Sequence, residues 1–295
     1  MQSIPVRLWP LLITICVSLS ACGGGGGGGS STPSQAGSSS NSGQTTSSSN
    51  QTSQPVQTTN TAPTNISLDL LVLFSPGVRT HYADPDLRIQ HLVNVANDVF
   101  TQSGLNTTLN LVGVEEIAYP DAVTATLALE ELTFGRHVST TQVANLRDTL
   151  QADLVVLLRP YANDGYCGYA WLNGYQTQGD LNPNQHADFA YAVVASNCSD
   201  YVLVHEIGHN LGLAHSREED ANGGTFTHSV GFGQDGAFAT IMADPNHFNA
   251  VQVPKFSSPN LVCMGQPCGV DKDLSHGADA VHTLELTPTQ VADYR

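Results

Sequence analysis

Apolar and polar positions after residue 64 alternate between strand-like and helix-like segments. Residues 66–74 form an apolar run rich in β-forming side chains, which stops at the turn sequence Ser-Pro-Gly, and a helix is expected after that turn. In residues 86–102 the apolar positions recur at helical spacing, and Gly104 can end this helix. Residues 107–117 then alternate and predict a second strand.

The same alternation continues up to a histidine-rich segment. A helix is predicted from about Tyr201, whereas after His215 the Gly and Pro content is high and no period is visible until a last predicted helix at 287–295. This order favours an α/β (α+β) fold with a mixed twisted sheet, followed by an irregular C-terminal subdomain. The remaining predicted elements are a helix at 140–151 and strands at 152–158, 166–172 and 189–195.

The first 63 residues differ in character from the rest. Residues 22–63 contain no charged side chain and consist mostly of Gly, Ser, Thr, Gln and Asn, so they bury too little apolar surface to fold. We expect a disordered tether at 22–63 and one globular domain at 64–295. The domain's length of about 230 residues suffices for a hydrophobic core.

Residues 1–21 are predicted to be a secretory signal peptide. A single basic residue, Arg7, precedes an apolar run at 8–19 that is too short to cross a bilayer. The sequence Leu19-Ser20-Ala21-Cys22 resembles a bacterial lipobox, which implies acylation of Cys22 and a lipoprotein held at the outer membrane or cell surface. The alternative is an ordinary signal peptide cut near Ala21, with release of the protein.

Charge narrows the range of partners. Of the ten Lys and Arg residues only Arg7 lies outside residues 64–295, so this part carries nine basic against 26 acidic side chains, a net charge of −17. Binding to nucleic acid requires clustered basic side chains. The composition therefore disfavours a nucleic-acid partner and favours a soluble, extracellular surface.

Four cysteines remain after those of the predicted leader and lipidation site are set aside. An even number in an exported domain favours two disulfides. Three pairings are possible, and the favoured one joins Cys263 to Cys268 and Cys167 to Cys198. A second zinc site built from Cys263, Cys268, His276 and His282 is the alternative, but its spacing fits no common structural zinc module.

Residues 205–215 carry the chemistry and read His-Glu-Ile-Gly-His-Asn-Leu-Gly-Leu-Ala-His. His205 and His209 are four residues apart, so on a helix their rings share one face and can hold one metal ion. Glu206 is placed to reach a metal-bound water as a general base. Gly212 can end the helix in a left-handed turn that brings His215 back as the third ligand. Three imidazoles and one open position are typical of a catalytic Zn²⁺ site.

These eleven residues match the metzincin zinc-protease signature, and the resemblance implies zinc ligation by the three histidines with Glu206 as the base. Metzincins also carry a Met-turn beneath the metal, and Met242 in Thr-Ile-Met-Ala stands at a similar distance. The order of elements across residues 66–295 resembles bacterial reprolysin-like peptidases, with the peptidyl-Asp metalloendopeptidases as the most similar group. The segments that carry this resemblance are 153–158, Cys167-Gly168-Tyr169-Ala170, His228-Ser-Val-Gly, the Met-turn and 256–260.

The sequence departs from the metzincin pattern at three points. Ser216 follows the third histidine where adamalysins have Asp, and Asp244 stands where some metzincins have a Tyr over the metal. Transition-state stabilisation would then depend on zinc and backbone donors. No cysteine-bearing prosegment is visible in residues 23–63, so latency by a thiol on zinc is not supported.

The function predicted from these features is zinc-dependent hydrolysis of peptide bonds in proteins. In the resembling folds the substrate pairs with an edge strand, which 166–172 or 189–195 could provide. Residues 245–256 would form one wall of the pocket for the residue after the cleaved bond. Lys255 there, or Arg217, could pair with an acidic side chain, although a solvated surface Lys is the simpler interpretation. Calcium is compatible with the acidity, but no Asp-x-Asp-x-Asp loop supports a site.

Two other classes of function remain open. One is a tethered binding or adhesion module that retains zinc without turnover, although the intact Glu206 argues against it. The other is a different metallohydrolase, such as one acting on cell-wall amides.

Overall fold

The computed structural model describes residues 14–18 and 65–295 of this chain. The predicted tether, the lipidation site Cys22 and the rest of the predicted leader lie outside the described residues. Within the two described ranges, no helix has both the length and the apolar character needed to cross a bilayer.

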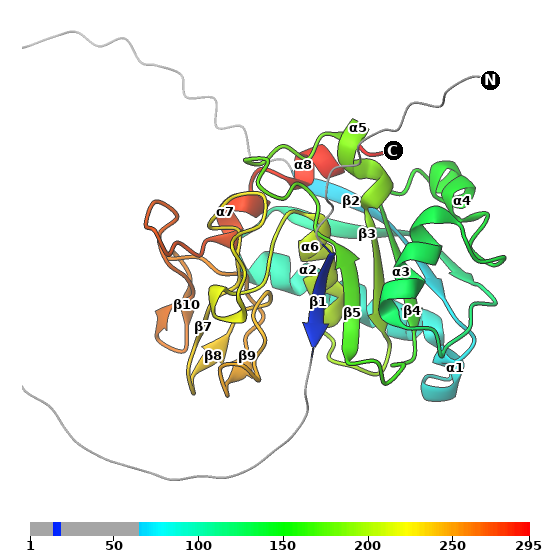
Figure 1. Cartoon of the computed structure of the whole chain (residues 1–295), viewed down its shortest axis with the longest axis horizontal. Coiled ribbons are helices and arrows are strands. Elements are labelled where there is room, and N and C mark those ends of the chain that lie inside the picture. Colours follow the sequence, from blue (N-terminus) through cyan, green and yellow to red (C-terminus); the bar gives the residue numbers. More distant parts are fainter. Residues whose placement is uncertain (1–13, 19–64) are drawn as a thin grey trace, which may run out of the picture. The chain divides into compact units, whose positions relative to one another are not determined.

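A six-stranded mixed sheet forms the centre of the domain, in the order β1-β5-β6-β4-β2-β3 (Figure 1). The four strands β6, β4, β2 and β3 run parallel, whereas β5 is antiparallel to both of its neighbours. The strands comprise β1 (Thr14–Ser18), β2 (Ile66–Phe74), β3 (Thr107–Glu116), β4 (Leu154–Arg159), β5 (Tyr166–Trp171) and β6 (Tyr191–Ala195). All strands predicted after residue 64 are confirmed, with ends within two residues of the expected ones.

Strand β1 comes from the segment predicted to be a signal peptide. It pairs with the outer edge of β5, with Ile15 opposite Ala170. Within residues 65–295, β5 is therefore the edge strand on this side and β6 is internal. The sequence left this choice open, and the structure decides it in favour of residues 166–172.

Helices cover both faces of the sheet because the side chains of its central strands alternate. Leu70 and Val72 of β2 point into a core shared with α2 (Pro85–Gln102) and α6 (Val202–Asn210). Leu71 and Leu73 of the same strand point into a second core shared with α3 (Ala125–Phe134) and the start of α4 (Val143–Leu150). The shorter helices comprise α1 (Val78–His81), α5 (Pro183–His186), α7 (Ala280–Leu284) and α8 (Pro288–Val291).

Two helix predictions are incomplete or wrong. Helix α3 was not predicted, although Thr124 caps its start and Gly135 ends it in a left-handed conformation. The single helix predicted at 287–295 is instead the one-turn α8, preceded by the separate α7. Tertiary contacts shape this end of the chain, because the buried Thr287 hydroxyl donates to the carbonyl of Leu211 and the Tyr294 hydroxyl to that of Leu181.

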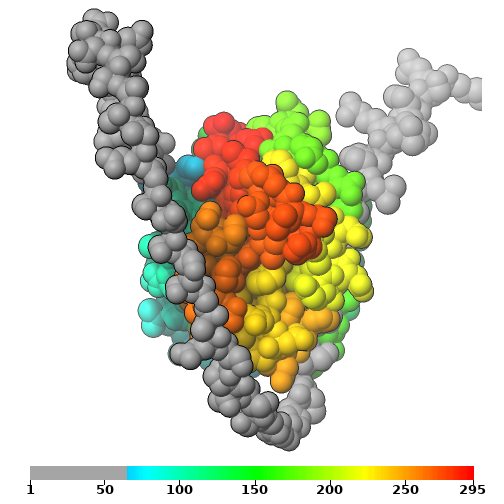
Figure 2. Space-filling model, turned by 90° about the vertical axis from the view of Figure 1, so that its left-hand side faces the viewer, coloured from blue at the N-terminus to red at the C-terminus, as the bar shows by residue number. Residues whose placement is uncertain are grey.

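The segments after α6 contain little regular structure, as predicted, and they gather on one face of the molecule, yellow to red in Figure 2. The regular elements here are a small sheet of β7 (Gly233–Gln234), β8 (Phe238–Ala239) and β9 (Val251–Gln252), and the hairpin of β10 (Val262–Cys263) and β11 (Gln266–Pro267). Two 3₁₀ turns occur within residues 65–295, η1 (Ala187–Phe189) and η2 (Arg217–Glu219).

Both favoured disulfides are formed. Cys263–Cys268 closes the β10–β11 hairpin, and both of its cysteines are buried. The alternative zinc site that used these two cysteines is therefore wrong, because their thiols are consumed by the bond. Cys167–Cys198 links strand β5 to the turn that precedes α6. This second bond connects the edge strand to the helix that carries the histidine motif.

Candidate active site

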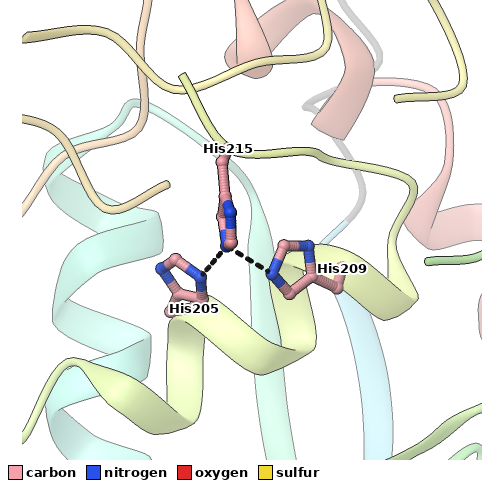
Figure 3. Close-up of side chains that lie close together, drawn as sticks. All are labelled: His205, His209 and His215. Atoms are coloured by element: carbon pink, nitrogen blue, oxygen red, sulfur yellow. Dashed lines mark hydrogen bonds between the residues drawn. The ribbon is translucent and has the colours of Figure 1, made fainter. Parts of the chain in front are cut away.

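Three buried histidines converge beside helix α6. His205 and His209 project from the same face of the helix, and His215 reaches toward them from the chain that follows (Figure 3). The Nε2 atom of His215 lies 3.2 Å from Nε2 of His205 and 3.2 Å from Nε2 of His209. Each of the three rings is at most 6% exposed. The structure thus brings together the three residues that the sequence selected as metal ligands.

The return of His215 depends on a tight turn at Gly212. This residue has φ +92°, in the left-handed region, where a glycine avoids the Cβ clash of other residues. The Gly212 N–H donates to the carbonyl of His209 at 3.0 Å, and the Leu213 N–H donates to that of Gly208 at 2.9 Å. These two bonds form the Schellman pattern that ends a helix. Gly212 therefore ends α6 as the sequence predicted.

The hydrogen bonds of the histidines fit a bound cation. Nδ1 of His205 donates to the carbonyl of Ile241 at 2.7 Å, and Nδ1 of His209 donates to that of Leu213 at 2.8 Å. In a neutral ring the other nitrogen, Nε2, then carries a lone pair. The Nε2 lone pairs of His205 and His209 are therefore both available to one metal ion. Two imidazole nitrogens bound tetrahedrally to zinc lie about 3.3 Å apart, which agrees with the observed spacing. The site therefore fits a metal ion.

Burial keeps these rings unprotonated. It lowers the pKa of His205 to about 4 and that of His209 to about 3, and it lowers the pKa of His215 well below its ordinary value. A neutral imidazole is the form that binds a metal. The site is thus prepared for metal binding throughout the neutral pH range.

Glu206 lies beside the histidines and is fully buried. Neither carboxylate oxygen has a hydrogen-bond partner among residues 14–18 and 65–295. Burial raises the pKa of this carboxyl well above its usual range. Buried polar groups normally pair with protein, ligand or water atoms, so this carboxyl fits a group that contacts a bound ligand or water. A raised pKa is typical of a proton-transferring carboxyl.

Met242 lies directly beneath the histidine helix. A Cβ placed on Gly208 of α6 would be 2.5 Å from the Met242 Sδ atom, and Met242 is fully buried. The preceding residue, Ile241, supplies the carbonyl that orients His205. The segment predicted to be a Met-turn thus packs against α6 and holds one of the three histidines.

Comparison with known proteins agrees with this site. Residues 68–274 match the Reprolysin-like description of metallopeptidase family M12B. The chain belongs to this reprolysin-like family. The family implies a bound metal, and the three-histidine cluster is the group within the described residues that could hold one.

Curated relatives of this reprolysin-like chain include peptidyl-Asp metalloendopeptidases from three bacteria. The one from Pseudomonas aeruginosa is 36% identical over 250 residues, which cover 78% of this chain and 40% of the relative. Those from Xanthomonas campestris pv. campestris and Stenotrophomonas maltophilia (strain R551-3) are 25% and 26% identical, and each match covers 81% of this chain and 54% or 55% of the relative. The chain thus spans only about half, or less, of the length of these relatives.

A solved structure shares the reprolysin-like fold. A chain in the structure of a chaperone–substrate complex matches with a TM-score of 0.60 and 26% sequence identity. The match covers 78% of this chain and 35% of that chain. The predicted metzincin-like arrangement of a mixed α/β layer is thereby confirmed.

A cavity of about 370 Å³ opens next to the histidine site of this reprolysin-like domain. Helix α6 forms one wall, and the segments 243–246 and 250–252 form the other. The sequence predicted a pocket wall at 245–256; the observed wall overlaps this range but begins two residues earlier and ends at Gln252. The lining residues are Ser199, Tyr201, Val202, His205, Glu206, Ala243, Asp244, Pro245, Asn246, Ala250, Val251 and Gln252.

The two basic residues considered for this pocket do not line it. The Lys255 ammonium donates to the carbonyl of Val262 at 2.8 Å. The Arg217 guanidinium donates to the carbonyls of Thr227 and Gly277. Both side chains stabilise loops of the C-terminal subdomain, so their predicted role in binding an acidic substrate side chain finds no support.

The departures from the metzincin pattern also have structural roles. The Ser216 hydroxyl donates to Glu219 at 2.6 Å, and the Asp244 N–H donates to the same Oε2 atom at 3.1 Å. Glu219 thus connects the chain after the third histidine to the chain after Met242. Asp244 lines the cavity.

Three contributors to the site were not identified from the sequence. Gly168 on β5 abuts Glu206, Gly208 leaves room for Met242, and Gln252 donates through Nε2 to the same Ile241 carbonyl that binds His205. Gly168 stood in a segment that resembled the family, which was the available signal. The other two contacts depend on tertiary packing.

Proposed function

We propose that this chain is a zinc-dependent endopeptidase that hydrolyses peptide bonds in proteins. The observation that carries the proposal is the convergence of three buried imidazole nitrogens beside a buried carboxylate that has no hydrogen-bond partner in the described part of the chain. Membership of a metallopeptidase family supports it. The cavity beside Glu206 provides room for a substrate side chain.

The chain's own residues divide the chemistry between them. His205, His209 and His215 would hold the metal, which supplies Lewis acidity toward water and the scissile carbonyl. Glu206 accepts the proton from the attacking water and passes it to the leaving amine. The apolar surroundings of Glu206 raise its pKa, which strengthens the carboxylate as the base in the first of these two transfers. The carbonyls of Ile241 and Leu213 fix the orientation of two ligand rings.

Substrate binding would use the edge of β5. An extended peptide can add a strand to a sheet edge through backbone hydrogen bonds. The antiparallel pairing of Thr14–Ser18 with β5 shows that this edge accepts another strand. Removal of the predicted leader would leave the edge open to substrate.

We further propose export of the protein with a lipid on Cys22 as its anchor. The short apolar run and the Leu-Ser-Ala-Cys sequence support this localisation. The uncharged tether would then hold the domain away from the membrane surface. A surface lipoprotein that binds zinc without turnover is the alternative function. The experiment described next separates the two functions.

The test compares the full zinc-loaded chain with its Glu206→Gln variant. Metal content and cleavage of an unfolded protein substrate are measured on both, with Glu115→Gln at an exposed strand end as the matched control. The expected result is one zinc per chain in all three proteins and a loss of cleavage of at least about a hundredfold in Glu206→Gln alone. Zinc binding without any cleavage by the native chain would favour the binding module.

A further inference from the structure

We propose that the cavity beside Glu206 selects neutral or basic substrate side chains and rejects acidic ones, with Asp244 as the discriminating residue. This inference rests on the proposed peptidase function. It sets the chain apart from relatives named for peptidyl-Asp cleavage. The argument depends on the position of the cavity, the charges around it and the fixed conformation of Asp244.

The position of the cavity makes it a side-chain pocket for a residue next to the cleaved bond. Its lining includes His205 and Glu206, which belong to the proposed reaction centre, whereas its far wall is formed by the turn after Met242. A side chain that enters the cavity therefore lies between helix α6 and Asp244. The cavity volume of about 370 Å³ accommodates a large side chain.

Away from the proposed metal ligands, the ionisable side chains of the lining that carry a formal charge at neutral pH are acidic. Glu206 and Asp244 are its two acidic residues, and no Lys or Arg of residues 65–295 lines it. The neighbouring Arg88 is already paired, because its Nη1 atom bonds Asp200 and its Nε and Nη2 atoms bond the carbonyl of Ser196. The other basic side chains of the described domain have partners elsewhere; these are Arg79, Arg136, Arg147, Arg159, Arg217, Lys255, Lys272 and Arg295.

Asp244 is held in place by a turn rather than free to swing away. Its Oδ1 atom accepts bonds from the backbone N–H and the Nδ2 of Asn246 at 2.9 and 3.0 Å. Its own N–H donates to Glu219 at 3.1 Å. Both bonds to the carboxylate use Oδ1, so Oδ2 keeps its capacity to accept a hydrogen bond from a ligand.

An acidic side chain in this cavity meets like charge in a partly dehydrated space. Placing like charges together is a common way to exclude a competing ligand, and the cost falls on the wrong substrate alone. A Lys or Arg side chain instead gains a partner in Asp244, and an apolar side chain contacts Val202, Pro245 and Val251. The net charge of −17 on residues 64–295 adds long-range repulsion of acidic peptides.

The experiment measures specificity with matched peptides. Products of an unfolded protein mixture first locate the cut sites of the zinc-loaded full chain. One cleaved sequence is then synthesised with Asn, Asp, Leu or Lys after the scissile bond, and kcat/KM is measured for each. The expected result is that the native chain cleaves the Asn peptide faster than the Asp peptide by at least about tenfold. The pair is informative because Asn and Asp have nearly the same shape.

Asp244→Asn is the variant that tests the residue itself. Asn keeps an oxygen that can accept from the Asn246 N–H, so the turn is retained. The variant should reduce the Asn-over-Asp ratio by about threefold or more and should reduce the rate for the Lys peptide. The control Asp98→Asn removes the same charge from an exposed position on α2 and should leave the ratios unchanged.

The outcomes separate this inference from the proposed function. Preferred cleavage of the Asp peptide, or an unchanged ratio in Asp244→Asn, would overturn the charge selection while leaving the peptidase function intact. Absence of cleavage of every peptide by the fully zinc-loaded native chain would overturn both proposals.

Discussion

Gly168 on strand β5 and Glu206 on helix α6 approach so closely that no side chain fits between them. A Cβ atom at Gly168 would lie 2.1 Å from Oε1 of Glu206, 2.5 Å from its Cδ and 2.7 Å from its Cγ. The whole Glu206 side chain would have to move, and it is fully buried. The absence of a side chain at Gly168 therefore sets the position of the proposed base.

Gly168→Ala should impair catalysis without removing the metal. The added methyl displaces the Glu206 carboxylate, and a misplacement of about 1 Å costs on the order of a hundredfold in rate. His205 and His209 are oriented by the carbonyls of Ile241 and Leu213, which do not involve Gly168, so zinc content should stay at one per chain. Metal analysis combined with kcat for a cleaved peptide checks this. An unchanged kcat would show that Glu206 has room to adapt.

The two disulfides should differ in their contributions to stability. Cys167–Cys198 spans 31 residues in sequence and Cys263–Cys268 spans five. In the loop-entropy description the longer loop contributes about 4 kcal/mol to the free energy of unfolding and the shorter one about 2 kcal/mol. Paired Cys→Ala variants of each bond, unfolded in denaturant, measure both values.

The same pair of variants should differ in activity. Cys167 precedes Gly168, and Cys198 precedes Ser199 of the cavity lining, so loss of this bond loosens both sides of the site. Loss of Cys263–Cys268 affects a hairpin that contributes no residue to the cavity lining. An equal fall in kcat/KM for both variants would contradict this distinction.

The histidine motif could be recognised in the sequence because its geometry is local. Helical spacing alone places His205 and His209 on one face, and Gly212 lies within the same eleven residues. The apolar runs likewise determined the strands, since buried parallel strands are nearly continuous apolar segments. Helix α3 carried its own signals in Thr124 and Gly135, but its predominantly apolar sequence obscured the helical stripe.

The rest of the site depends on contacts between distant segments. The approach of Gly168 to Glu206 follows from the position of β5 in the sheet, and the place of Asp244 in the cavity follows from the path of the chain after Met242. The Lys255 side chain points to Val262 because of the loop that carries it. The spacing of residues in the sequence does not determine these contacts between distant segments.

Gly208 and Met242 provide a test of packing beneath the metal site. A methyl at Gly208 would lie 2.5 Å from the Met242 sulfur, so Gly208→Ala should lower the free energy of unfolding by about 1–3 kcal/mol through overpacking. Met242→Ala should cost about 2–5 kcal/mol through a cavity. In the double variant the added methyl partly fills that cavity. The double variant should therefore lose about 1 kcal/mol less of the free energy of unfolding than the sum of the two single losses. Urea unfolding of the four proteins measures this coupling, and strict additivity would contradict the contact.

Asp153 should make stability depend on pH in the weakly acidic range. Its side chain is 3% exposed, its Oδ2 accepts from the N–H of Asp69 at 2.9 Å, and burial raises its pKa from 3.8 to about 6. The pKa of Asp153 is higher in the folded state than in the unfolded state. Its contribution to the free energy of unfolding is therefore fully present below about pH 4 and is lost as the pH rises through 6. A shift of about two pKa units corresponds to about 3 kcal/mol.

Asp153→Asn mimics the protonated carboxyl and retains an acceptor for Asp69. The variant should match the native chain near pH 4 and should exceed its free energy of unfolding by up to about 3 kcal/mol above pH 6. Urea unfolding at pH 4, 5, 6 and 7 checks this, and the exposed Asp98→Asn should show no such pH-dependent difference. A difference between Asp153→Asn and the native chain that stays constant from pH 4 to 7 would mean that Asp153 remains ionised in the folded protein throughout.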